Sequence, residues 1–450
     1  MNEPSRQSWL QTLAVYTDRR VIAILLLGFS SGLPLLLTLS TLTIWLAEEG
    51  ISKTTIGLFA LVGLPYSIKF LWAPLIDRLP LPPLTTLLGR RRGWAVGTQL
   101  ALMVGIVGLG GADPSTNLLA MAWWAALVAF ASASQDVVID AYRVELLDES
   151  QYGAGAAMYV AGYRVGMLAA GAGALFLAEA TTWFLVYCAM AVLVLIGVGT
   201  ILLSPEPEAA DVPEQEQRAA EWLRERTRLT GAPMRLLQWL HGAAISPFAD
   251  FMSRPAWLSI LLFILLYKFG DALAGVMANP FYVEIGFTKG EIASVSKIFG
   301  LAATLMGGFI GGLMVVRVGI LRSLFLCGVL QMLSNLMFAV QAMVGHDVGM
   351  LTLVIALENL AGGMGTAAFV AYLSALCNVA YTATQYALLS SFMSFGRTTL
   401  SSSGGWIADQ TDWITFFVIT TVAALPGLLL LVWLARRGYK AEASPAAAGD

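Results

Sequence analysis

The segment QYGAGAAMYVAGYR, residues 151 to 164, has a counterpart later in the chain, QYALLSSFMSFGR at residues 385 to 397. Two further pairs keep the same order: KTTI at 53 to 56 matches KGEI at 289 to 292, and AEATTW ending at Trp183 matches ADQTDW ending at Trp413. The offsets all lie between 230 and 236 residues. One such match could arise by chance, but three in order indicate a duplication, so we predict two related halves in parallel order.

The composition is typical of a membrane protein. Hydrophobic residues make up 58% of the 450 residues and charged residues only 12%, whereas soluble domains have roughly half apolar and about a quarter charged residues. The net charge of -3 gives no reason to expect nucleic-acid binding. Cys188, Cys327 and Cys377 lie in apolar stretches without CxxC spacing, so neither a disulfide framework nor a metal site is predicted, and no cofactor is expected.

The hydrophobic runs fall into two groups of six, each long enough to supply about 20 residues per membrane crossing. They cover 20–46, 53–74, 93–112, 117–142, 154–178 and 182–203, and then 256–283, 290–315, 321–343, 349–376, 385–407 and 413–435. We predict an all-α membrane protein of twelve transmembrane helices in two six-helix repeats. The predicted parts are an N-terminal half (1–203), a linker (204–255), a C-terminal half (256–435) and a tail (436–450). A parallel duplication of six helices is the arrangement of major facilitator transporters.

The distribution of basic residues predicts the orientation. If the N-terminus is cytoplasmic, 19 of the 26 lysines and arginines lie in cytoplasmic segments and only Lys53 and Lys289 lie outside. The positive-inside rule therefore predicts that both termini are cytoplasmic. In the linker, AAEWLRERTRLTGAPMRLLQWLHG mixes Trp, Leu and Arg, which predicts a helix lying in the cytoplasmic headgroup region. A solvated linker helix is the alternative.

Acidic residues inside the spans are candidates for proton coupling. A charge at the bilayer centre costs about 2.5 to 3.5 kcal/mol on insertion scales, so it normally faces a cavity or a partner. The candidates are Asp136, Asp140, Asp271 and Glu358. Asp136 and Asp140 are four residues apart and share one helical face, where two close carboxylates can share a proton. Alternatively, Asp140 pairs with Arg143 or Arg78 as a cytoplasmic latch.

Cations and polar groups inside the spans are candidates for binding an anionic substrate. Arg164 and Arg397 occupy matched positions in the two halves, and a guanidinium can bind a carboxylate through two hydrogen bonds; packing or gating is the alternative. Lys268 is three residues from Asp271, so a structural salt bridge is the alternative for this pair. The full candidate set is Tyr66, Lys69, Gln135, Tyr163, Arg164, Lys268, Lys297, Asn359 and Arg397.

The segment PLIDRLPLPPLTTLLGRRRGW after the second span combines an acidic residue with a basic cluster. It is a stretched form of the gate signature of facilitators, although an ordinary positively charged loop would look similar. The gating candidates are Asp77, Arg78, Arg90 and Arg143.

Segments from the first to the eleventh span resemble the AmpG muropeptide permeases. They are GFSSGLPL, FLWAPLIDR with GRRRGW, SASQDVVIDAYR, GYRVGML, LYKFGDAL, SKIFGLAAT, ENLAGGMGT and ATQYALLS. The resemblance implies a bacterial inner-membrane importer of 1,6-anhydromuropeptides (GlcNAc-anhydroMurNAc with or without peptide), driven by the proton gradient. It also implies a role in peptidoglycan recycling and β-lactamase induction. We expect a monomer surrounded by membrane lipid, whose partners are the muropeptide and protons.

Other functions remain as alternatives. A facilitator for another anionic conjugate, such as a CoA ester or a sugar conjugate, would share the fold. A membrane-embedded enzyme is disfavoured, because the two histidines, His241 and His346, lie outside the spans and no triad or metal spacing is present. A sensor that binds without transport would show no counterflow.

Overall fold

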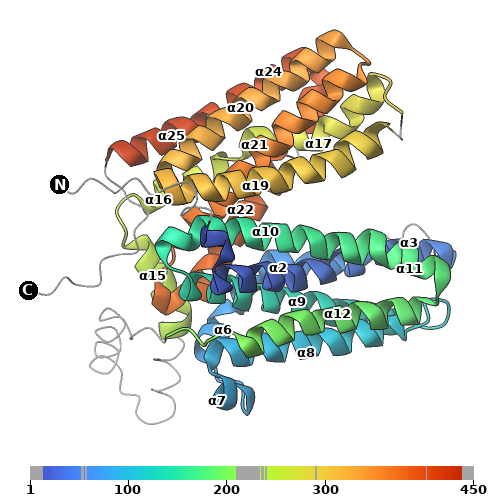
Figure 1. Cartoon of the computed structure of the whole chain (residues 1–450), viewed down its shortest axis with the longest axis vertical. Helices are drawn as coiled ribbons and strands as arrows, with labels where there is room; N and C mark the ends of the chain where they lie inside the picture. The colour runs from blue at the N-terminus through green and yellow to red at the C-terminus, as the bar shows by residue number, and fades with distance from the viewer. Residues whose placement is uncertain are drawn as a thin grey trace, which may run out of the picture.

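The protein is described by a computed structural model that covers residues 14–51, 55, 58–208, 234, 238, 241–288, 291–401 and 403–437. The regular elements of these residues are helices, and they form two bundles (Figure 1). The interfacial linker helix predicted between 204 and 255 lies largely outside the described residues, as do Lys53 and Lys289.

The first bundle runs from the start of the described chain to Leu203. Its elements are η1 (Val15–Thr17), α2 (Arg19–Thr38), α3 (Ser40–Glu48), η2 (Ala60–Gly63), α5 (Leu64–Ile68), η3 (Lys69–Leu71), α6 (Ala73–Arg78), α7 (Leu84–Leu88), α8 (Arg90–Gly110), α9 (Leu118–Leu146), η4 (Glu149–Gln151), α10 (Tyr152–Leu168), η5 (Ala169–Gly173), α11 (Ala174–Ala180) and α12 (Trp183–Leu203).

Two short elements of the linker, η6 (His241–Ile245) and α15 (Ser246–Met252), precede the second bundle. The elements of the second bundle are α16 (Trp257–Leu266), α17 (Phe269–Glu284), η7 (Ile292–Phe299), α19 (Gly300–Val318), α20 (Ile320–Val344), α21 (Val348–Ala375), η8 (Val379–Tyr381), α22 (Thr382–Ser401), α23 (Ser403–Gln410), α24 (Trp413–Ala423) and α25 (Leu425–Arg436).

Ten stretches of the described chain are long and apolar enough to cross a membrane, which confirms ten of the twelve predicted spans. The second predicted span, 53–74, is divided into short elements, because Pro65 and Pro74 lie in the first turns of α5 and α6 and lack the N–H that would continue the preceding helix. Its apolar helix, Leu61–Leu71, is short. The eleventh, 385–407, falls on α22 and α23, whose many Ser, Thr and Gln residues lower their apolarity. Crossing by these two remains a prediction.

Glycines bring helix backbones into contact inside each bundle. A Cβ atom on Gly162 of α10 would lie 1.9 Å from the carbonyl oxygen of Leu25 on α2, so this site requires glycine. In the second bundle, a Cβ on Gly307 of α19 would lie 2.1 Å from the carbonyl oxygen of Leu360 on α21. Such backbone contact between helices replaces the hydrophobic drive that is lost within lipid.

The two bundles meet at one end and diverge toward the other (Figure 1). At the joined end, Gly153 of α10 faces Gly312 of α19, where a Cβ on Gly153 would lie 2.7 Å from the Gly312 oxygen. Ala383 and Ala387 of α22 belong to an apolar cluster of the first bundle, and Val144 of α9 belongs to one of the second. The hydrophobic core is therefore continuous between the bundles at this end.

Candidate functional site

An aspartate from the first bundle caps a helix of the second at the joined end. Asp77, in the last turn of α6, accepts hydrogen bonds from the backbone N–H of Thr384 at 2.8 Å and from the Thr384 hydroxyl at 2.6 Å. The N–H of Ala383 also donates to it, at 3.3 Å. Because the first turn of a helix has free N–H groups and a positive dipole end, the buried carboxylate is well placed to bind the start of α22. This contact joins the two bundles directly.

The same carboxylate is held from its own bundle by an arginine that sequence reasoning missed. The Arg91 guanidinium lies 2.8 Å from Asp77 and also donates to Glu145 near the end of α9. Of the predicted gating residues, Arg90 donates to the Asp77 carbonyl at 2.8 Å. Arg78 donates to the Gly242 carbonyl at 3.1 Å and lies over the Tyr381 ring. The three-arginine cluster was the signal that pointed to this network, but it did not indicate which arginine was central.

Buried charges of alternating sign lie between η3 and α9. The Lys69 ammonium lies 3.7 Å from Asp140, and the Arg143 guanidinium lies 3.4 Å from the other oxygen of Asp140. Asp136, one turn away, is also buried, and its Oδ1 has no hydrogen-bond partner among the described residues. Asp140 therefore pairs with Arg143, one of the two partners considered from the sequence, and with Lys69, for which no acidic partner was predicted.

Arg143 also connects the two bundles through aromatic rings. Its guanidinium lies 5.3 Å from the ring centre of Tyr159 on α10 and 5.1 Å from that of Tyr386 on α22. These distances fall within the range of cation–π attraction. The guanidinium is nearly fully buried, and its Nε has no hydrogen-bond partner in the described part of the chain. Both tyrosines belong to the repeated segments, which are the sequence signal that could have found them.

The remaining first-bundle candidates lie on α5, α9 and α10. Gln135 is fully buried, donates to the Ser31 hydroxyl at 3.5 Å, and has an amide oxygen without a partner among the described residues. Tyr66 and Tyr163 are half-buried, and the Tyr163 ring lies 6.1 Å from that of Tyr159. Because buried polar groups are normally hydrogen-bonded, the unpaired oxygen of Gln135 is available to a ligand or water.

In the second bundle, the structure contradicts the salt bridge considered for Lys268 and Asp271. Lys268 donates to the Thr366 hydroxyl at 2.8 Å, and Asp271 accepts from the Gln331 amide at 2.5 Å. No ion pair within 4 Å joins the two among the described residues. The reason is local: α16 ends at Leu266 and α17 begins at Phe269, so Lys268 lies in a break between helices and the three-residue spacing does not place it above Asp271.

Glu358 and Asn359 interact with each other on α21. The Asn359 amide donates to Glu358 at 2.7 Å and to the Ile355 carbonyl at 3.0 Å, while its oxygen accepts from the Thr304 hydroxyl at 2.8 Å. Lys297 lies in η7, and its side chain is outside what the structure describes.

Two cavities contain candidate cations. The larger, of about 400 Å³, lies between the bundles and is lined by Leu36, Arg164, Met167, Leu168, Gly171, Ala172, Ser296, Leu301, Thr304 and Asn359. The smaller, of about 140 Å³, lies in the second bundle and is lined by Ile264, Leu265, Lys268, Phe269, Thr366, Phe369, Val370, Met393, Ser394 and Arg397. Arg164 and Arg397 are exposed in these cavities, so the structure places the matched arginines on surfaces that a ligand can reach.

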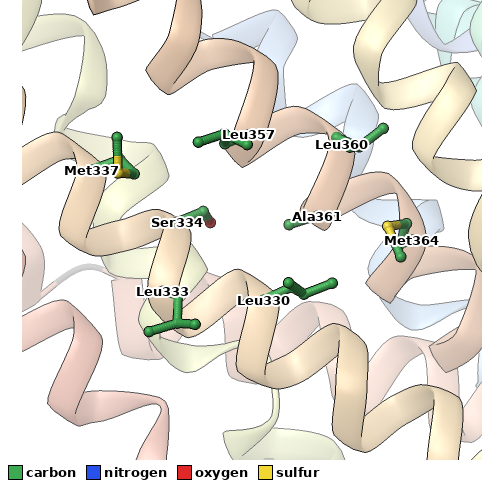
Figure 2. A pocket seen from close by; sticks show the side chains of 8 residues that line it. All are labelled: Leu330, Leu333, Ser334, Met337, Leu357, Leu360, Ala361 and Met364. Carbon is green, nitrogen blue, oxygen red and sulfur yellow. The ribbon is translucent and has the colours of Figure 1, made fainter.

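A third cavity, between α20 and α21, has a different character. Its volume is about 240 Å³, and Ser334 carries the one side-chain oxygen among the residues that line it (Figure 2). The Ser334 hydroxyl already donates to the Gln331 carbonyl at 2.8 Å. An apolar gap of this kind does not suit a charged substrate.

Both the sequence and the fold match a known superfamily. The family model of the Major Facilitator Superfamily matches residues 21–273 and 260–450. Among solved structures, the proton:xylose symporter XylE aligns with a TM-score of 0.63 at 12% identity, covering 96% of this chain and 97% of that one. The transporter FucP, in the outward conformation, also gives a TM-score of 0.63 at 12% identity, covering 92% and 98%.

Relatives in sequence are permeases. The anhydromuropeptide permease of Escherichia coli strain K12 is 41% identical over 426 residues, which cover 94% of this chain and 81% of the relative. The putative transporter AmpG 4 of Rickettsia conorii is 36% identical, covering 93% and 97%. The chain therefore belongs to the Major Facilitator Superfamily and, within it, to the AmpG permeases. This confirms the resemblance seen in the sequence: the protein is a membrane-spanning secondary transporter of small molecules and not an enzyme.

Proposed function

We propose that this transporter imports 1,6-anhydromuropeptides, GlcNAc-anhydroMurNAc with or without peptide, across the bacterial inner membrane for peptidoglycan recycling. The observation that carries the proposal is the 41% identity, along 94% of the chain, to a protein named anhydromuropeptide permease. Because the identity extends over nearly the whole length, we assign the cargo in the relative's name to this chain as well.

The cavities support a cargo of this chemistry. A sugar conjugate that carries carboxylates needs hydroxyl and amide partners for its sugar and cations for its acids. Arg164, Ser296, Thr304 and Asn359 line the cavity of about 400 Å³ between the bundles. Binding between the bundles lets one ligand contact both halves, as alternating access requires.

Proton coupling is proposed for the acids inside the spans. Asp140 is paired with both Lys69 and Arg143, so a proton on Asp140 would weaken those pairs, whereas a proton on its neighbour Asp136 would keep Asp140 ionised and paired. In the second bundle, Asp271 and Glu358 are the corresponding candidates. Moving one positive charge inward is favoured by about 2.3 kcal/mol for each 100 mV of membrane potential. The proton gradient would thereby bias the direction of transport.

We infer that the joined end is cytoplasmic, because it carries the arginine-rich segment after the second predicted span. Both termini would then be cytoplasmic, and the described conformation would face outward. Import would require the halves, 1–203 and 256–435, to rock as a monomer within the lipid bilayer. During this movement the Asp77–Thr384 contact would break, and so would the cation–π contact of Arg143 with Tyr386.

Uptake of labelled GlcNAc-anhydroMurNAc-tripeptide into proteoliposomes tests the proposed cargo. Unlabelled anhydromuropeptide is expected to compete with the label, whereas a CoA ester at the same concentration is not. Competition by the CoA ester alone would assign the transporter to another anionic conjugate. Recovery of chemically unchanged cargo inside the vesicles is the expected sign of transport without chemistry.

A further inference from the structure

The small cavity of the second bundle combines two cations with no acid. Lys268 and Arg397 line it together with the hydroxyl residues Thr366 and Ser394, and its other lining residues are apolar. None of the described residues that line it carries a carboxylate. Both cations line the same cavity of about 140 Å³, so one anionic group inside it can interact with both. The site therefore favours an anionic ligand.

Two acids act on these cations from outside the lining of the cavity. Asp271 and Glu358 lie within electrostatic range of Lys268, and Asp271 also of Arg397, but the hydrogen bonds of these carboxylates come from neutral amides. Asp271 accepts from Gln331, and Glu358 accepts from Asn359. Lys268 itself donates to the neutral hydroxyl of Thr366 at 2.8 Å. An ammonium has three donors, so Lys268 can bind a carboxylate while it keeps this contact.

Lys268 has no charged counterpart at the matched positions of the first half. Arg397 has the matched residue Arg164 in the first half, but residues 32 to 38, GLPLLLT, which lie at the repeat offsets from Lys268, contain no charge. Among the described residues, Arg164 is the cation that lines the cavity between the bundles, beside the polar groups of Ser296, Thr304 and Asn359. The described linings of the two cavities thus differ in size and in their polar groups.

We propose that the two cavities bind different parts of one cargo: the Lys268–Arg397 cavity binds a carboxylate of the peptide, and the cavity beside Arg164 binds the disaccharide. This assignment rests on the proposed transport of anhydromuropeptides. A volume of about 140 Å³ suits a carboxylate-bearing end group, whereas the cavity of about 400 Å³ has the room and the hydroxyl and amide groups for sugar rings. Peptide-bearing cargo therefore gains affinity from a subsite in the second half.

The test compares two competitors for uptake of labelled cargo: GlcNAc-anhydroMurNAc-tripeptide, and the same compound with every peptide carboxylate amidated. In the wild type, amidation is expected to weaken competition by about tenfold or more, the factor for loss of one charge-assisted hydrogen bond. In Lys268→Gln and Arg397→Gln, the difference between the two competitors is expected to shrink to about twofold or less. Arg322→Gln, which removes an exposed arginine outside both cavities, should keep the wild-type ratio.

Arg164→Gln distinguishes the two subsites. This variant is expected to weaken both competitors by a similar factor, so that the effect of amidation is retained. The assignment is overturned if amidation has no effect on the wild type, or if Arg164→Gln, and not Lys268→Gln, removes that effect. Absence of competition by either compound in the wild type would instead contradict the proposed cargo.

Discussion

Replacing Asp77 with Asn is expected to shift the transporter from the conformation described here toward one that is open at the joined end. Asp77 accepts bonds from the N–H and the hydroxyl of Thr384 across the interface. With a neutral acceptor, each of these two hydrogen bonds is weaker by about 1 kcal/mol. Loss of the negative charge at the start of α22 costs about 0.3 to 1 kcal/mol more of the free energy that holds the bundles together. The total of about 2 to 3 kcal/mol changes the ratio of the two conformations by a factor of about 30 to 150.

Electron–electron distance measurements between spin labels at Leu87 and Val318 would detect this shift. These exposed residues lie in α7 of the first bundle and at the end of α19 in the second. The three native cysteines would first be replaced, since Cys188 is only partly buried. The wild type should give one dominant short distance, and Asp77→Asn should add a longer one.

Asp113→Asn provides the matched control, because Asp113 lies in the loop after α8 and accepts from Ser115 within its own bundle. It should preserve the short distance. The same distribution in Asp77→Asn as in the wild type would refute the argument that the capping contact holds the bundles together.

Three further substitutions probe the interface and the stability of the first bundle. Gly153→Ala should separate the bundles and lower uptake at least tenfold, because its new Cβ would lie 2.5 Å from a side-chain atom of α19; Gly199→Ala, where no atom lies within 4 Å, should have little effect. Arg143→Lys keeps the charge but replaces the guanidinium over the Tyr386 ring with a more strongly hydrated ammonium. A cation–π contact is worth about 0.5 to 2 kcal/mol, so weakening it should lower uptake several-fold, and an unchanged rate would argue against that contact. Glu206→Gln weakens the two hydrogen bonds that N–H groups at the start of α8 donate to this side chain. The free energy of unfolding should fall by about 1 kcal/mol and the midpoint of thermal unfolding by about 2 °C. Equal midpoints for the variant and the wild type would contradict the capping role.

The repeat and most of the spans could be predicted from the sequence, because apolar length and repeated motifs are local properties. The matched glutamines Gln151 and Gln385 illustrate this: each donates at 2.8 Å to an aspartate just before the first long helix of its bundle, Asp18 or Asp250. The same motif therefore makes the same contact twice. The segment after the second span does contain a charged network around Asp77, and its role as a gate stays a prediction.

Contacts between distant segments could not be predicted in the same way. Nothing local in the sequence pairs Asp77 with Thr384, which is 307 residues away, or places Arg143 between two tyrosine rings. The pairing considered for Lys268 and Asp271 was wrong because it assumed an unbroken helix where the chain has a break. Likewise, apolar length alone did not reveal that prolines divide the second predicted span.

The most direct test of the central claim is proton-driven accumulation in proteoliposomes, measured for the wild type and for Asp136→Asn with labelled GlcNAc-anhydroMurNAc-tripeptide. With an inward proton gradient, the wild type should accumulate the cargo above its external concentration, and collapsing the gradient should release it to equilibrium. Asp136→Asn should lose accumulation but retain exchange of internal for external cargo. Equal accumulation with and without the gradient would contradict proton coupling, and no uptake by a correctly folded wild type would contradict the proposed import itself.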